Sequence, residues 1–258
     1  MTLYEGWSVT NHWHLYIFAR WTTDFDCGYE TDWWYIIKDD KFDIGSLKAK
    51  RRYEINKGKK NFEVKEIRAD EYTDEIYEIT ATVYQQYPAS YRPVIHEEKF
   101  KESLTGWEKF KVYGAFHKET GKLCGYAWLK VYDSYADFCV LKVLPAYERL
   151  GINAAIVEKI VVDFNSKLGN NFYICDGARA LLHETAFQNY LEKYFGFRKA
   201  YCNLQMKYRF PIAIIVRVIY PFRNRIKKEG KLFSKIKTVL LFEEIARNCK
   251  IVKSKKKA

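Results

Sequence analysis

Three apolar segments joined by short polar turns, and closed by a proline, constrain the fold of this chain most. They are "FKVYGAFH" (110–117), "LCGYAWLKVY" (123–132) and "ADFCVLKV" (136–143). Aromatic and β-branched residues of this density are typical of strands, and turns such as "KETGK" are typical of hairpins. The sequence therefore predicts a three-stranded antiparallel meander that ends at Pro145.

Helical and extended patterns alternate on both sides of this meander. Apolar residues recur at helical spacing in four segments, and short apolar or alternating runs occur in three others. The predicted helices cover 71–87, 96–104, 151–168 and 183–195, and the predicted further strands cover 62–67, 172–177 and 200–210. This mixed order predicts the α+β class, with helices packed on a largely antiparallel sheet.

Two flanking segments extend this arrangement. Aromatic strands at 13–21 and 33–38 predict an N-terminal β extension, followed by a basic helix at 44–61 with Ser46 as its N-cap and Gly58 as its stop. An apolar stretch and a basic stretch after residue 210 predict a helical C-terminal tail. We expect three parts: 1–61 packed on the main domain, the main domain itself at 62–210, and the tail at 211–258.

The net charge of +12 is concentrated in two places. Residues 41–68 hold 10 basic and 4 acidic residues, and residues 223–258 hold 13 and 3. Polyanion contact through these segments is one interpretation, and a solvated charged surface is the other. On one face of the basic helix, Lys48, Arg51 and Arg52 are the candidate phosphate-binding side chains.

The composition also indicates a cellular compartment. The six cysteines have no CxxC spacing, and no secretory signal pattern opens the chain, so reduced thiols in the cytoplasm are expected. The longest apolar run, 210–222, is too short to span a bilayer and contains Arg217. The five histidines show no metal-ligand spacing, so no metal site is predicted.

The element order from residue 62 to about 210 resembles the GNAT acyltransferase fold. "EKYFGFRKAY" (192–201) resembles the closing helix, Gly-Phe turn and strand of that family. The resemblance implies acyl-CoA as a co-substrate, bound by the loop that opens "PAYERLGINAAI" (145–156). The residues at the matching positions are Glu148, Arg149, Gly151, Ile152 and Asn153.

This loop departs from the family pattern. Glu148 stands where Arg or Gln is usual, and its carboxylate would oppose a bound pyrophosphate. Arg149 and Asn153 replace small residues, although a helix N-terminus at 151 still offers free N–H groups. A working phosphate site and a plain strand-to-helix turn are therefore both open.

The basic stretch "SLKAKRRYEINKGKKNFEV" (46–64) resembles the start of the second GNAT-like domain of Fem-type peptidyltransferases. Those enzymes take their amino acid from aminoacyl-tRNA and carry two such domains, whereas this chain has room for one. This resemblance implies a tRNA-linked donor as the alternative to acyl-CoA.

The richest candidate site is "YICDGARALLHETAF" (173–187), just past a buried strand. His183 is the candidate general base, Asp176 is a further candidate catalytic residue, and Arg179 and Thr185 are candidate substrate-binding residues. Structural roles, with Asp176 in a turn and His183 starting a helix, are the alternative. Glu192 stands where the GNAT family often has a proton-donating Tyr, so it completes the candidate catalytic set.

The combined interpretation is an N-acyltransferase that moves an acyl or aminoacyl group to an amine on a sugar or lipid-linked intermediate. The alternative is a non-catalytic GNAT-derived protein that binds nucleic acid or an anionic membrane. In the tail, a stripe of apolar residues edged by lysines predicts peripheral contact with the inner face of an anionic membrane, or packing on the protein's own core. The stripe consists of Leu232, Phe233, Ile236, Val239 and Leu240.

Overall fold

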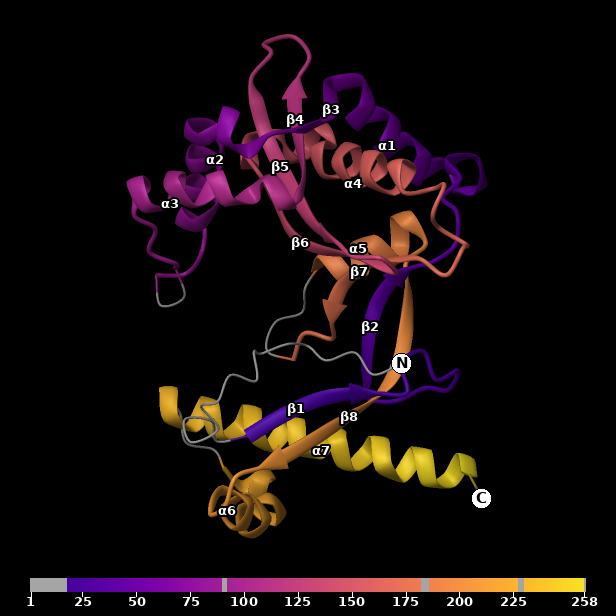
Figure 1. The fold of residues 1–258 in the computed structure, drawn as a ribbon, viewed down its shortest axis with the longest axis vertical. Helices are drawn as coiled ribbons and strands as arrows, with labels where there is room; N and C mark the ends of the chain where they lie inside the picture. The colour runs from indigo at the N-terminus through magenta and orange to yellow at the C-terminus, as the bar shows by residue number, and fades with distance from the viewer. Residues whose placement is uncertain (1–17, 90–91, 182–185, 227–229, 258) are drawn as a thin grey trace. The chain divides into compact units, whose positions relative to one another are not determined.

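The computed structural model describes residues 18–89, 92–181, 186–226 and 230–257. The chain forms two compact units, and both are built from segments that are separate in sequence (Figure 1). The central unit comprises residues 37–177 and 187–198, and the terminal unit comprises 1–36, 178–186 and 199–258. The three consecutive parts expected from the sequence stay a prediction.

The central unit contains the elements that the sequence predicts, in the predicted order. Helices α1 and α4 lie over one face of its sheet, and α2 and α3 over the other (Figure 1). The elements are α1 (Ala49–Asn61), β3 (Phe62–Ile67), α2 (Thr73–Gln85), α3 (Glu97–Leu104), β4 (Lys111–His117), β5 (Leu123–Val131), β6 (Tyr135–Val143), α4 (Ile152–Asp163), β7 (Tyr173–Ala178) and α5 (Ala186–Phe195).

The sheet of the central unit has the strand order β7-β6-β5-β4-β3. All neighbours are antiparallel except β6 and β7, which are parallel. Alternating side chains fill the two faces, because successive residues of a strand point to opposite sides. Val112 packs with Ile76 and Leu104 from α2 and α3, whereas the Tyr113 hydroxyl donates to Asp163 at the end of α4 (3.2 Å). The predicted α+β fold is confirmed.

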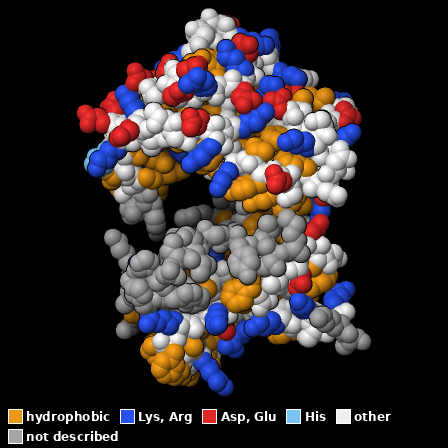
Figure 2. All heavy atoms as spheres, viewed as in Figure 1, with side chains coloured by type: hydrophobic (Ala, Val, Ile, Leu, Met, Phe, Trp, Pro, Cys, Tyr) orange, Lys and Arg blue, Asp and Glu red, His pale blue; other side chains and the backbone are white. Residues whose placement is uncertain are grey.

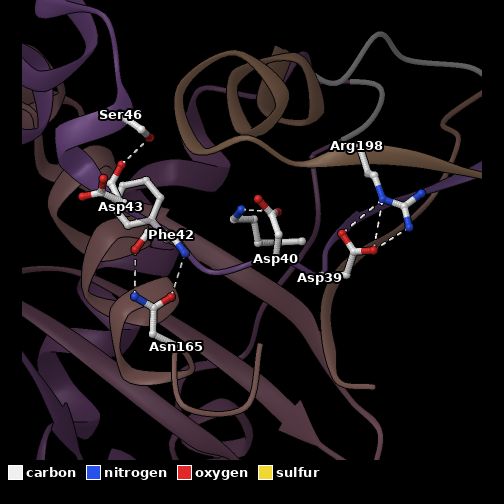
Figure 3. A network of polar contacts seen from close by, with 8 residues as sticks. Asp39, Asp40, Phe42, Asp43, Ser46, Asn165 and Arg198 are labelled. Atoms are coloured by element: carbon white, nitrogen blue, oxygen red, sulfur yellow. Dashed lines mark hydrogen bonds and ion pairs between the residues drawn. The ribbon is translucent and has the colours of Figure 1, made fainter. Parts of the chain in front are cut away.

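Polar contacts fix the segment that leads into α1 (Figure 3). The Arg198 guanidinium pairs with the Asp39 carboxylate. The Asn165 side chain donates to the Phe42 carbonyl and accepts from the Phe42 N–H, both at 2.8 Å. Asp43 caps a short 3-10 turn by accepting from Gly45 N. The prediction that Ser46 caps the basic helix is wrong: α1 begins at Ala49 without a side-chain cap, since Asp43 has already closed the preceding turn.

The described residues of the terminal unit form three strands and two α-helices. They are β1 (Phe18–Thr23), β2 (Trp33–Lys38), β8 (Arg198–Tyr208), α6 (Ile212–Ile219) and α7 (Lys231–Lys257). The strand order is β1-β8-β2, and β1 runs antiparallel to β8 from Phe18↔Tyr208 to Thr23↔Asn203. The predicted strand at 13–21 is thus a strand from residue 18 onward, and its first residues lie outside the described part of the chain.

The tail helix α7 packs on the strands of its own unit. Leu240, Ile245 and Cys249 are buried, and the Phe242 ring lies 5.9 Å from the Trp33 ring. Asn248 Nδ2 donates to Asp32 Oδ2 (2.7 Å). Of the apolar stripe, Leu240 is buried and Phe233, Ile236 and Val239 are half-buried, while the Leu232 side chain lies outside the described residues. Membrane contact by the tail stays a prediction. In the described residues, no helix is both long enough and apolar enough to cross a membrane.

Candidate active site

The parallel strands β6 and β7 part toward their carboxyl ends. Three residue pairs join them, from Tyr135↔Tyr173 to Asp137↔Cys175, and no later pair is formed between these two described strands. On the other side of β6 the register with β5 slips, so that Cys139 is an extra residue between Phe138 and Val140. A bulge of this kind bends its strand. The carboxyl half of β6 is therefore free to diverge from β7.

Asp176 follows directly after the last of these pairs. The residue is half-buried, and burial raises the pKa of its carboxyl to about 7. A hydrogen bond from Gln188 opposes this rise, and the charge of Asp137 adds to it. Gln188, which is buried on α5, also donates to the Asp176 main-chain carbonyl (3.3 Å). A carboxyl with this pKa can both accept and release a proton near neutral pH.

The loop after β6 turns into α4 as the sequence predicts. Pro145 opens a 3-10 turn that ends at Leu150, and Gly151 adopts φ = +84°, which glycine tolerates best. The α4 helix has no side-chain N-cap, so the N–H groups of its first turn have no acceptor within the helix. Their positive dipole end favours an anion.

The side chains of this loop offer mixed chemistry. Glu148 and Arg149 are exposed, whereas Gly151 and Ile152 are buried. The Asn153 Oδ1 atom is buried and has no hydrogen-bond partner in the described part of the chain. The dipole of α4 therefore favours an anion near this turn, while the carboxylate of Glu148 opposes one, so the phosphate-binding role of this loop stays a prediction.

Position 151 is also glycine because the main chain there packs closely against α1. A Cβ atom at Gly151 would lie 2.9 Å from the Gly58 nitrogen, and one at Gly58 would lie 2.3 Å from the Gly151 carbonyl oxygen. Asn61 Nδ2 donates to the Leu150 carbonyl (3.2 Å). The prediction that Gly58 stops the basic helix is wrong: α1 continues to Asn61, and Gly58 is small because the turn before α4 packs against it.

The candidate phosphate-binding side chains of α1 differ in their surroundings. Lys48 is exposed and Arg51 is half-buried. The Arg52 guanidinium donates to the carbonyls of Leu47 (2.6 Å) and Gly45 (3.1 Å), so it holds the chain before α1.

The other predicted site residues are distributed over both units. The Arg179 guanidinium donates to the Asp32 carbonyl (2.8 Å) within the terminal unit. Glu192 is half-buried on α5, where its neighbour Tyr190 stacks near Tyr194 with ring centroids 4.8 Å apart. His183 and Thr185 lie outside the described residues. The roles proposed for all these residues stay predictions.

Sequence reasoning missed Lys142. It lies opposite Tyr126 in the β5–β6 ladder, and its ammonium group is 5.1 Å from the Tyr84 ring centroid. Burial lowers the pKa of Lys142. The signal was a lysine at an alternate position of an otherwise apolar strand. Among the described residues, no three His, Cys, Asp or Glu side chains form a group that could hold a metal ion.

Comparisons with known proteins give similarity to solved structures at low sequence identity. No protein-family model and no curated protein matches the chain. The C-terminal domain of a protein described as a lysylphosphatidylglycerol synthetase from Agrobacterium fabrum is 11% identical, with a TM-score of 0.48, over 71% of this chain and 62% of that one. The L-PGS structure from Bacillus licheniformis is 13% identical, with a TM-score of 0.44, over 79% and 66%.

A third solved structure is the PaiA N-acetyltransferase from Thermoplasma acidophilum in complex with coenzyme A. It is 20% identical to this chain, with a TM-score of 0.32, over 42% of this chain and 74% of that one. The chain thus spans less than two thirds of the Agrobacterium domain. The solved structures to which this chain is similar therefore include an N-acetyltransferase and a lysylphosphatidylglycerol synthetase domain.

Proposed function

We propose that this chain is an acyltransferase that moves an acyl or aminoacyl group to an amine, with Asp176 as the proton acceptor. The observation that supports it is a half-buried carboxyl with a pKa of about 7, placed where two parallel strands part. A carboxylate that only stabilised the fold would gain from a cation or from several N–H donors, which lower its pKa. Asp176 has instead the proton affinity that a general base needs at neutral pH.

The proposed reaction is a direct transfer. The amine nitrogen attacks the acyl carbonyl carbon, and its proton passes to the Asp176 carboxylate. The bond from the acyl carbon to the leaving sulfur or oxygen then breaks, and the leaving atom takes a proton to end as a thiol or hydroxyl. Free N–H groups at the start of α4 would hold the phosphates of the donor. Glu192 stays our candidate for returning a proton to the leaving group.

Two donors fit the charges of the central unit. An acyl-CoA would place its pyrophosphate at the start of α4, against the opposition of Glu148. An aminoacyl-tRNA would make broader phosphate contacts, for which the exposed Lys48 and the neighbouring Arg51 on α1 are suited. Both donors are cytosolic molecules, so we propose a cytoplasmic reaction.

A transfer assay on the full chain tests the proposal. Purified protein is given either radiolabelled acetyl-CoA or a mixture of labelled aminoacyl-tRNAs, together with amino sugars and aminolipids as acceptors. We expect transfer from one donor class that depends on the carboxylate of Asp176. The absence of transfer from both classes, with CoA and tRNA binding retained, would instead support the non-catalytic binding role.

Glu148 gives a prediction for donor binding. Glu148→Arg should tighten CoA binding roughly fivefold, because a nearby charge reversal removes repulsion from the pyrophosphate and adds attraction. Isothermal titration calorimetry with CoA measures this. Glu102→Arg is the matched control, since Glu102 is exposed on α3, over the opposite face of the sheet from α4. Equal affinities of wild type and Glu148→Arg would show that this loop does not hold the pyrophosphate.

A further inference from the structure

The α6 helix and its flanks expose a cluster of large apolar side chains. Phe210 is 75% exposed, Val218 is 61% exposed and Phe222 is 52% exposed, and Ile214 and Ile215 between them are about half exposed. Figure 2 shows orange side chains gathered over α6, with blue side chains beside them. We call these five residues the α6 patch. Contiguous apolar surface of this kind usually marks a binding surface.

Helical geometry places the patch on one side of α6. Val218 lies four residues after Ile214 and three after Ile215, so it is a surface neighbour of both on one side of the helix. Val216 points away from this face and is buried. The helix is therefore held to the terminal unit through Val216, while its other side has no partner in the described part of the chain.

The charged residues of the segment that carries the patch are all arginines. Between residues 209 and 226 the sequence has four arginines and no Asp or Glu. Arg217 and Arg225 are exposed, and the Arg225 guanidinium lies 5.9 Å from the Phe222 ring centroid. Arg223 differs, since it pairs with Glu244 on α7 (2.8 Å). Apolar side chains next to guanidinium groups suit the boundary between acyl chains and anionic headgroups.

We propose that the α6 patch binds the surface of anionic phospholipid membranes. The apolar side chains enter the headgroup layer, and Arg217 and Arg225 contact lipid phosphates. This assigns membrane contact to α6, whose large apolar side chains are more exposed than those of the α7 stripe. The proposal does not depend on the transferase activity.

Vesicle flotation with the full chain tests this proposal. Vesicles of phosphatidylcholine with 30% phosphatidylglycerol are compared with vesicles of pure phosphatidylcholine. We expect wild type to float with the anionic vesicles only. The double variant Ile214→Asp/Val218→Asp should lose at least tenfold in bound fraction, and Arg217→Glu/Arg225→Glu should lose binding to a similar extent.

The control variant is Ile251→Asp, because Ile251 is equally exposed but lies on α7. It should bind as wild type does, and circular dichroism confirms that every variant is folded. Wild type that fails to float overturns the proposal. So does an Ile214→Asp/Val218→Asp variant that floats like wild type, since binding would then be purely electrostatic. A wild-type dimer in sedimentation that this variant dissociates, without flotation, would assign the patch to a second copy of the chain.

Discussion

Asp176→Asn should lower kcat about 10²- to 10⁴-fold in the transfer assay, because an amide cannot accept the proton of the attacking amine. The wild-type rate should rise with pH through an apparent pKa near 7, since burial raises the pKa of this carboxyl to about 7 and only the ionised form is a base. Steady-state kinetics between pH 5.5 and 8.5 measure both effects. Asp133→Asn, on the exposed β5–β6 turn, is the control and should leave the profile unchanged.

The same variant has an effect on stability that does not need a known substrate. The folded-state pKa of about 7 lies above the unfolded value near 3.9. The folded protein therefore holds the extra proton between these values, and the free energy of unfolding contributed by Asp176 falls as pH rises from about 4 to 7. Asp176→Asn should not show this loss, because its amide does not titrate. The free energy of unfolding of the variant, relative to wild type, should therefore be about 1–2 kcal/mol higher at pH 8 than at pH 4.5. Urea denaturation of both proteins at the two pH values measures this effect. A difference in free energy of unfolding that is the same at both pH values would contradict the burial of Asp176.

Gly58→Ala should destabilise the central unit by about 1–3 kcal/mol. Alanine normally stabilises a helix interior by about 1 kcal/mol relative to glycine. Here its Cβ would lie 2.3 Å from the Gly151 carbonyl oxygen, so α1 and the turn before α4 must move apart. The midpoint of urea unfolding measures the loss of stability.

The control for Gly58→Ala is Gly106→Ala, because a Cβ at Gly106 meets nothing within 4 Å. This variant should stay within about 0.5 kcal/mol of wild type. If Gly58→Ala is as stable as wild type, the close contact between α1 and the α4 turn is absent. The side of the α4 start that faces α1 would then be accessible to a ligand.

Local patterns were enough to predict most of the central unit. The meander and α4 depend on side-chain periodicity and on Pro145, which act within a few residues. Gly58 was misinterpreted because its role depends on a residue that is far away in the sequence. Glycine normally ends or weakens a helix, and only the distant Gly151 explains why it lies within one. A contact between two residues so far apart in sequence produces no recognisable pattern in the residues around either of them.

The candidate site could be predicted only in part. The position of Asp176 near the end of a buried strand was visible. Its raised pKa was not, because it comes mainly from burial in the folded protein, with Asp137 on β6 adding to the rise and Gln188 on α5 opposing it. The amphipathic tail was also visible as a pattern. Periodicity says that a helix has an apolar side, and it does not say whether that side meets the protein or a membrane. In the structure α7 packs on the core through residues such as Leu240 and Ile245. The large apolar side chains of Ile214 and Val218 on α6 are exposed.

The pairing of β1 with β8 has a consequence for how the chain folds as it is made. Phe18 is paired with Tyr208, so the first strand waits for nearly the whole central unit to be synthesised before its partner exists. The central unit can fold during this time, because all of its strands and helices precede residue 199. Aromatic residues such as Trp21 and Trp33 stay without β8 and α7 during that interval. Apolar surface that stays exposed during such a delay promotes aggregation until β8 and α7 have been made.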